Sequence, residues 1–257
     1  IDENLGSYED VDEAVQKLSQ GALEHVTLYS IMQDPMTSLN PLKKVGKQIQ
    51  ECIELHQGLK GAVAKKATLQ ILEKVGIPYP EMRYNQYPHE FSGGMRQRAM
   101  IAIALACKPE ILIADEPTTA LDVTIQAQVL EMIRNLKQKN NTSMLLITHD
   151  LGVVAQNCDS VAIIYAGEIV EYGTLSQVYE NTLHPYTEGL FGSIPNLETN
   201  SRRLAAIDGM MPDPTMLPKG CKFADRCKYA EERCHVENPQ LMELEDGHKV
   251  RCFRCMK

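Results

Sequence analysis

The stretch FSGGMRQRAMIAIALACKPEILIADEPTTALD, residues 91–122, decides the fold class predicted for this chain. A Ser-Gly-Gly sequence at 92–94 leads into an apolar helix predicted over residues 99–106. The Lys-Pro pair at 108–109 ends that helix, and the short apolar run 111–114 then predicts a fully buried strand. Two acids, at 115 and 116, follow at the carboxyl end of this strand, which is where open α/β sheets bind ligands.

The polar residues of this stretch suit phosphate chemistry. Ser92 can cap the helix, while Gly93 and Gly94 let backbone N–H groups approach an anion, so the helix start predicts a phosphate site. At the end of the strand, Asp115 would hold a magnesium ion and Glu116 could polarise the water that attacks a terminal phosphate. Each element alone also fits an ordinary capped helix or a solvated acidic turn. Their order and spacing together favour a nucleotide site.

Several segments resemble the motifs of one family. FSGGMRQR resembles the signature motif of ABC transporter ATPases, ILIADEP their Walker B strand and TTALD their D-loop. QDPMTSLNP at 33–41, HPYT at 184–187 and the late cysteines resemble the oligopeptide/dipeptide importer branch. The resemblance covers nearly the whole chain from about Val26 onward.

The resemblance implies a fold and a domain organisation. The fold is α/β, a P-loop NTPase-type (ABC ATPase) core with a helical subdomain and a Cys-rich, mostly irregular C-terminal extension. Periodicity fades from about Ser176 and prolines become frequent, so the last boundary is expected between about Glu171 and Tyr186. The expected parts are a partial N-terminal piece of the core ending in the Q-loop (1–40), the helical subdomain (41–88), the core with signature, Walker B, D-loop and switch histidine (89–175), and the extension (176–257).

Hydrophobic periodicity predicts the remaining elements. Further strands are expected at 26–32, 143–148, 161–165 and 168–173, the second of them buried, with helices at 123–137 and 151–158 and a mostly helical segment at 40–87. The first of these strands ends at Gln33, and the second delivers His149 to the sheet edge that holds Asp115.

The roles of the family's motif residues carry over onto matching positions. The resemblance implies that Glu116 is the general base and that His149, whose ring can hydrogen-bond on two sides, bridges Glu116 and the terminal phosphate. A histidine or glutamine after a strand is more often just a polar residue at a strand end, so these assignments depend on the neighbouring motifs. The implied set is completed by Gln33 and Asp115 for ATP and Mg²⁺, by Ser92, Gly93, Gly94 and Gln97 as the signature that meets a partner's ATP, and by Asp122 in the D-loop.

Five cysteines gather late in the sequence, at Cys221, Cys227, Cys234, Cys252 and Cys255. Their intervals are too long for the paired knuckles of ordinary zinc modules, except between the last two. Spacing alone leaves zinc, an iron–sulfur cluster and no metal open. The resemblance to peptide-importer ATPases implies a [4Fe–4S] cluster on the first four cysteines, with Cys255 as an alternative last ligand and zinc as an alternative metal.

Composition restricts the partners. The chain of 257 residues has a net charge of −8, which offers no support for a nucleic-acid partner. It contains no apolar run of transmembrane length, and its eight cysteines without a secretion signal favour a reducing compartment. The resemblance implies a place at the cytoplasmic face of the cell membrane, bound to a second ABC ATPase (homologous or identical), two transmembrane permease subunits and, indirectly, an extracytoplasmic solute-binding protein.

The phosphate loop G-x-x-x-x-G-K-[ST] (Walker A) is expected before Gln33, and these residues do not contain it. Gly46-Lys47 is followed by Gln48 and has no glycine lead-in. The favoured explanation is a piece of a longer protein, because the downstream catalytic residues are intact. The alternative is a degenerate subunit that supplies only the signature motif. In either case, these residues alone are expected to show little ATP turnover.

The predicted function is ATP binding and hydrolysis that power ABC import of di- and oligopeptides. A nickel or other small-solute importer ATPase remains an alternative, as does a hydrolysis-deficient partner, regulatory or metal-binding subunit. A non-transport ABC protein of DNA repair or translation is disfavoured by the acidic charge and by the QDPMTSLNP and HPYT segments.

Overall fold

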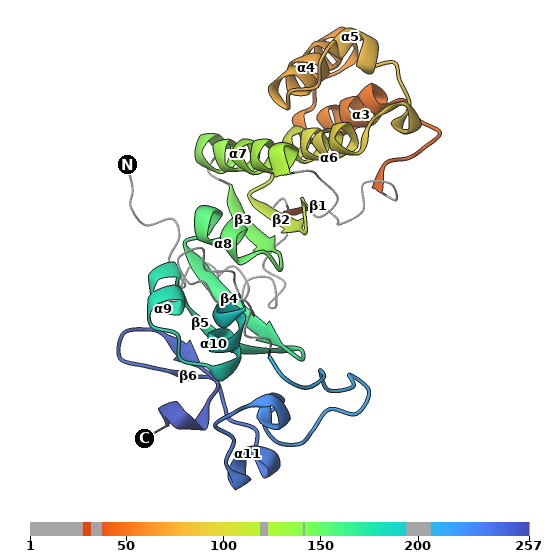
Figure 1. Cartoon of the computed structure of the whole chain (residues 1–257). Helices are drawn as coiled ribbons and strands as arrows, with labels where there is room; N and C mark the ends of the chain where they lie inside the picture. The colour runs from red at the N-terminus through yellow and green to blue at the C-terminus, as the bar shows by residue number, and fades with distance from the viewer. Residues whose placement is uncertain (1–27, 32–37, 119–122, 141, 194–206, 257) are drawn as a thin grey trace. The chain divides into compact units, whose positions relative to one another are not determined.

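The computed structural model describes residues 28–31, 38–118, 123–140, 142–193 and 207–256 (Figure 1). The chain divides into two compact units, residues 1–157 and 158–257.

A parallel three-stranded sheet lies in the first unit, with strand order β1-β2-β3. Its strands are β1 (Leu28–Ile31), β2 (Ile111–Asp115) and β3 (Ser143–Ile147). Asp115 lies opposite Ile147 in the register. The carboxyl ends of β2 and β3 therefore meet at one edge of the sheet, as the sequence predicts.

Helix α6 (Gly93–Cys107) is apolar on nearly all sides because it is surrounded by other elements. Ala99, Ile101 and Ala102 are fully buried. The helix packs against β1 and against α3 (Val45–Gln57) and α4 (Gly61–Lys74). It thus connects the sheet to the helical subdomain.

The helical subdomain consists of α3, α4 and the short α5 (Pro80–Arg83), which Figure 1 shows grouped beyond α6. Gly46 in the first turn of α3 donates its backbone N–H to the carbonyl of Tyr84 at 3.1 Å. A Cβ atom at Gly46 would lie 2.2 Å from Cδ2 of Tyr84. Only glycine fits this contact. The 3₁₀ turn η1 (Pro88–Glu90) then leads into α6.

Helix α7 (Val123–Asn140) precedes β3, and α8 (Leu151–Asn157) follows it. The prediction that the strand at 143–148 is buried is wrong for the described structure. Leu145 is 51% exposed and Ile147 is 46% exposed. Alternate side chains of a strand face opposite sides, so Leu145 and Ile147 share one face of β3, which is an edge strand of the described sheet, and that face is open to solvent.

The second unit is built on an antiparallel hairpin of β4 (Ser160–Tyr165) and β5 (Glu168–Thr174), as predicted. Two short strands, β7 (Lys249–Val250) and β6 (Met242–Glu243), extend it to the order β4-β5-β7-β6. The pairing of β5 with β7 joins the hairpin to the later residues, so residues 158–257 form one compact unit. The domain boundary expected between 171 and 186 stays a prediction. The hairpin belongs to the second unit because the later strands β6 and β7 complete its sheet.

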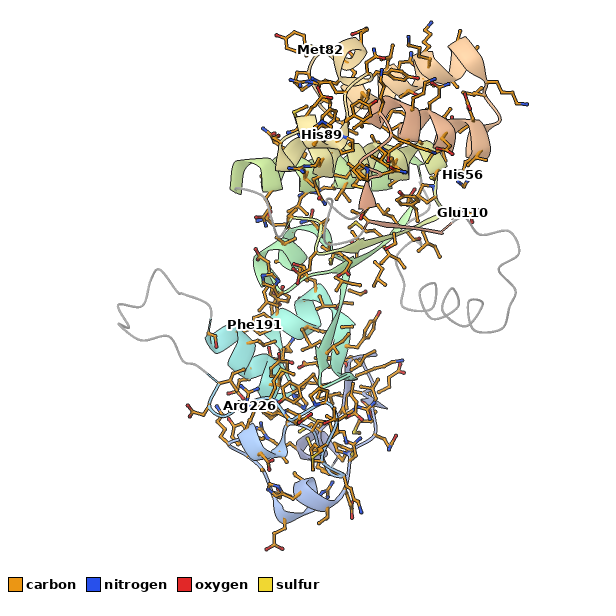
Figure 2. All side chains as sticks on the ribbon, turned by 90° about the vertical axis from the view of Figure 1, so that its right-hand side faces the viewer. His56, Met82, His89, Glu110, Phe191 and Arg226 are labelled. Atoms are coloured by element: carbon orange, nitrogen blue, oxygen red, sulfur yellow. The ribbon has the colours of Figure 1, made fainter. Side chains whose placement is uncertain are left out.

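Helices α9 (Leu175–Glu180) and α10 (Pro185–Gly192) follow the hairpin. The ring of Phe191, which Figure 2 labels, packs against the ring of Tyr179, and the two ring centroids are 4.6 Å apart. From residue 207 onward the described helical elements are short: η2 (Ala224–Arg226), α11 (Glu232–Val236) and η3 (Phe253–Cys255). Arg226 of η2, labelled in Figure 2, donates to the carbonyl oxygens of Ile207 and Asp208. These bonds connect residues 207–208 to η2.

Candidate functional site

The sheet edge of the first unit brings Glu116 and His149 into contact. Nδ1 of His149 lies 2.9 Å from Oε1 of Glu116. The contact follows from the parallel pairing of β2 with β3, because Asp115 and Ile147 are opposite each other at the ends of the strands. The proposed general base and the proposed switch histidine therefore share one site.

The backbone of Glu116 has a conformation that few residues other than glycine adopt, with φ of 44°. Its N–H donates to the carbonyl of Ile147 at 2.9 Å, which holds the turn after β2 against the end of β3. Backbone strain of this kind is characteristic of functional sites. The side chain of Glu116 is 21% exposed and so remains accessible.

The hydrogen bond to Glu116 and the negative charge of that carboxylate raise the pKa of His149. The His149 side chain is 73% exposed, so solvent screens the interaction. The adjacent Asp150 acts mainly as a helix cap. Its Oδ1 accepts the backbone N–H groups of Gly152 and Val153 at 2.9 and 3.1 Å.

Asp115, the predicted magnesium ligand, is half-buried at the same edge. Its carboxylate forms no hydrogen bond or ion pair with another described residue. A carboxylate without protein partners at this edge is suited to bind a cation, directly or through water.

The signature residues begin α6 as predicted. Ser92 is the N-cap, and its hydroxyl accepts the backbone N–H of Met95 at 3.3 Å. Gly93 is exposed, and a Cβ at this position would meet no atom within 4 Å. Gly94 is half-buried. The exposed start of the helix is thus available to an external anion.

Gln97 is buried, and its Nε2 donates to the carbonyl of Pro117 at 2.6 Å. This bond joins the signature helix to the turn that holds Glu116. Sequence reasoning placed Gln97 only among the signature residues and missed this link, because no spacing rule predicts a side chain's contact with a backbone carbonyl 20 residues away. Gln33 and Asp122, the remaining predicted site residues, lie outside the described residues.

A second site lies in the C-terminal unit, where four cysteines line one pocket. Cys221, Cys227, Cys234 and Cys252 share this pocket with His184 and Phe223, and with other residues of the tail. Cys255 does not line it. Burial raises the pKa of the Cys221, Cys227 and Cys252 thiols, and their mutual proximity contributes to the same direction.

Backbone N–H groups point at the four pocket sulfurs. Cys221, Cys227 and Cys252 each accept the N–H of the residue two positions later in the sequence. Cys234 Sγ lies 3.5 Å from the N–H of Glu231. Within the described ranges, however, no group of three or more His, Cys, Asp or Glu side chains is placed to hold a metal ion. The metal assigned to these cysteines remains a prediction.

A buried carboxylate secures the wall of this pocket. Glu171 of β5 is fully buried and accepts three hydrogen bonds, from the Leu183 N–H at 2.8 Å, the His184 N–H at 2.9 Å and Nε2 of His248 at 3.0 Å. Burial lowers the pKa of His184 to about 4, so this ring is neutral at physiological pH. Sequence reasoning used HPYT only as a family marker, and no periodicity signalled Glu171 or His248.

Comparison with known proteins identifies the family of this chain. Residues 6–119 match the family described as "ABC transporter", and residues 170–234 match "Oligopeptide/dipeptide transporter, C-terminal region". The chain is 52% identical over 223 residues to the oligopeptide transport ATP-binding protein AppD of Bacillus subtilis, covering 87% of this chain and 68% of that protein. This chain belongs to the ABC transporter ATP-binding proteins.

Other ABC transporter proteins are similarly close. OppD of Bacillus subtilis is 54% identical over 87% of this chain and 63% of its own length, and OppD of Haemophilus influenzae is 49% identical over 87% and 69%. The chain thus spans about two thirds of the length of these relatives. Both are called oligopeptide transport ATP-binding proteins.

A solved structure supports the fold. The ATP-binding cassette MJ0796, a dimer in a post-hydrolysis state bound to ADP and Pi, matches with a TM-score of 0.52 and 25% identity, over 64% of this chain and 67% of that one. The predicted ABC ATPase fold is confirmed, and with it the assignment to a family that couples ATP hydrolysis to transport. None of the described helices is long and apolar enough to cross a membrane.

Proposed function

We propose that the protein is the ATP-hydrolysing subunit of an ABC importer of di- and oligopeptides. The observation that carries the proposal is the 2.9 Å contact between Glu116 and His149 at the carboxyl edge of a parallel sheet. Gln97 supports it, because it connects this edge to the signature helix through Pro117. The C-terminal match and the names of the relatives favour peptides as the transported solute.

In this proposal each residue has one task. Glu116 polarises the attacking water, and His149 contacts the terminal phosphate while its other ring nitrogen stays on Glu116. Asp115 and Gln33 hold Mg²⁺, which neutralises the charge that develops on the phosphates. Asp122 belongs to the D-loop.

The exposed start of α6 contacts the ATP that a partner ATPase binds. Ser92, Gly93 and Gly94 present a hydroxyl and backbone N–H groups to ATP bound by a partner ATPase, identical or homologous. Closure of the pair on ATP and reopening after hydrolysis drive two transmembrane permease subunits, which receive solute from an extracytoplasmic binding protein. The protein is then peripheral, at the cytoplasmic face of the membrane.

The test is transport-coupled hydrolysis by the full-length protein, reconstituted with its partner ATPase and permeases in proteoliposomes. Addition of binding protein loaded with a di- or oligopeptide mixture should stimulate ATP turnover. Stimulation by Ni²⁺ but not by peptides would show that the transported solute is not a peptide, while the ATPase function would stand. No hydrolysis in the complete assembly would leave a subunit that supplies only its signature motif.

We further infer that the pocket cysteines hold a [4Fe–4S] cluster through Cys221, Cys227, Cys234 and Cys252. The sulfurs of a single zinc ion, each about 2.3 Å from the metal, would be only about 3.8 Å apart, whereas cluster ligands bind four separate irons and lie further apart. The four thiols that line one pocket supply the four-thiolate set that a [4Fe–4S] cluster takes. Cys255 is disfavoured as a ligand because it lies outside the pocket lining.

Backbone donors strengthen this inference, because N–H groups aimed at ligand sulfurs stabilise thiolates that burial would otherwise keep protonated. The cluster would tether a segment that has little hydrophobic core. Iron and acid-labile sulfide should be found at about four of each per chain in protein purified without oxygen. One equivalent of zinc and no iron would contradict the cluster, and Cys255→Ser should leave the iron content unchanged while Cys252→Ser lowers it.

A further inference from the structure

His184 lies where the hairpin β4–β5 meets the cysteine pocket. Its backbone N–H donates to Oε2 of Glu171 at 2.9 Å, and its ring centroid lies 5.8 Å from that of Phe223. Both rings line the pocket, although His184 is only 1% exposed. The imidazole is therefore a buried wall of the site that the four cysteines share.

A hydrogen bond fixes which ring nitrogen of His184 carries the proton. As the N-cap of α10, Nδ1 accepts the backbone N–H of Tyr186 at 3.0 Å. A nitrogen that accepts carries no proton, so the neutral ring has its proton on Nε2. Among the residues that the structure describes, Nε2–H has no acceptor. An N–H donor in a ring as enclosed as this one is more stable with an acceptor than without one.

The sulfurs of the pocket are the acceptors at hand. Cys221, Cys227 and Cys252 each receive one backbone N–H, and thiolate and sulfide sulfurs can accept more than one. His184 is the N-cap of α10 and lies before the cysteine-bearing segment in the sequence, yet it lines the same pocket as the four cysteines. It adds a donor that the tail itself does not supply.

We propose that Nε2–H of His184 donates a hydrogen bond to a sulfur of the cluster held by the four cysteines, and thereby raises its reduction potential. This inference rests on the proposed metal centre. Reduction increases the negative charge on the sulfurs, so an N–H donor stabilises the reduced form more than the oxidised one. His184 acts here as a tuning residue and not as a ligand.

Two substitutions separate this role from the capping role of the same side chain. His184→Asn keeps an acceptor near the Nδ1 position for the Tyr186 N–H but loses the donor that reaches the pocket. His184→Gln restores an N–H donor near the Nε2 position. His56→Asn changes an exposed histidine of α3 and serves as the matched control (Figure 2). The readouts are the cluster's reduction potential, its Fe–S stretching bands and iron per chain, in full-length protein purified without oxygen.

The proposal requires His184→Asn to retain its iron, shift the reduction potential to a more negative value and shift the Fe–S bands. His184→Gln should recover most of both shifts, and His56→Asn should match the wild type. If iron-loaded His184→Asn has the reduction potential of the wild type, the proposed hydrogen bond to the cluster is contradicted. Loss of iron in both His184 variants overturns it too, because His184 is then a ligand or a structural support. Wild-type protein without iron overturns the metal centre itself and leaves the ATPase proposal untouched.

Discussion

The carboxylate of Glu116 and the imidazole of His149, which are 33 positions apart in the sequence, are joined at 2.9 Å. The turn that carries Glu116 is fixed by a backbone bond to Ile147, and the loop that carries His149 begins at the same residue. The pair therefore depends on the register between β2 and β3. Since both side chains stay accessible to solvent, the contact can be tested by substitution and by titration of the imidazole.

Glu116→Gln in the full-length protein should retain ATP binding and lower ATP turnover by about 100-fold or more, the contribution typical of a positioned general base. Glutamine keeps the size and the hydrogen-bonding oxygen but loses the basic carboxylate. Nucleotide binding and steady-state hydrolysis, measured on the same preparation, separate the two effects.

The matched control is Glu110→Gln, just before the opposite end of β2 (Figure 2). Glu110 is exposed, and its backbone carbonyl, which the substitution leaves in place, accepts the N–H of Ser143. Its turnover should equal that of the wild type. Unchanged turnover in Glu116→Gln would remove Glu116 from the role of general base.

His149 should titrate above about 6.5, its ordinary value, because Glu116 raises its pKa. The folded state binds this proton more tightly than the unfolded state, so the resulting stabilisation is full below pH 6.5 and is lost as the pH rises through the raised pKa. NMR titration of the imidazole resonances, assigned with His149→Asn, measures the shift. In Glu116→Gln the pKa should fall back toward 6.5. Identical titration in both proteins would mean that the contact is not formed in solution.

Gly93→Ala should leave folding intact and still reduce ATP turnover of the full assembly. A Cβ at Gly93 meets nothing within 4 Å, so stability should change by less than about 0.5 kcal/mol. The methyl group would instead obstruct the approach of the helix start to a partner's phosphate.

Gly46→Ala provides the opposite case, since its Cβ would lie 2.2 Å from Cδ2 of Tyr84 and 2.6 Å from the Tyr84 carbonyl oxygen. It should destabilise the helical subdomain by about 1–3 kcal/mol. Urea unfolding and hydrolysis assays on both variants test the pair. Full turnover in Gly93→Ala would show that no phosphate approaches this helix start closely.

Glu171→Ala should destabilise the C-terminal unit by about 3–5 kcal/mol, because it leaves His248 and two backbone N–H groups without their acceptor in a buried site. The amides of Leu183 and His184 should lose protection in hydrogen exchange. Glu180→Ala, an exposed glutamate of α9, should change stability by less than about 0.5 kcal/mol. If both variants exchange alike, Glu171 does not secure this wall of the pocket.

The sequence predicted those features that depend on local pattern. The apolar run 111–114 forms a strand and the Ser-Gly-Gly stretch starts α6 as expected, and the helix cap at Ser92 is confirmed. The strand is not fully buried as predicted, because Ile111 and Ile113 are half-buried. The convergence of Glu116 and His149 was also predictable, because carboxyl ends of parallel strands share an edge. The cap and the strand depend only on residues that are neighbours in the sequence, and the shared edge follows from a general rule for parallel sheets.

Features that depend on distant pairing were not predictable. The two-residue strand β7 is too short to show periodicity, yet it pairs with β5 and joins the hairpin to the end of the chain's second unit. The bond from Gln97 to Pro117 and the acceptor role of Glu171 likewise depend on tertiary placement. The exposure of Leu145 was missed because an apolar sequence does not report which face of a strand is covered.

The pairing of β5 with β7 has a consequence for synthesis in the cell. Glu171 leaves the ribosome some 77 residues before His248, the partner that meets its carboxylate. The second unit has an unpaired edge of β5, and Glu171 lacks its His248 partner, until residues 248–250 are made. Premature termination anywhere in the tail would therefore leave an aggregation-prone hairpin, a product that cellular proteases are well suited to remove.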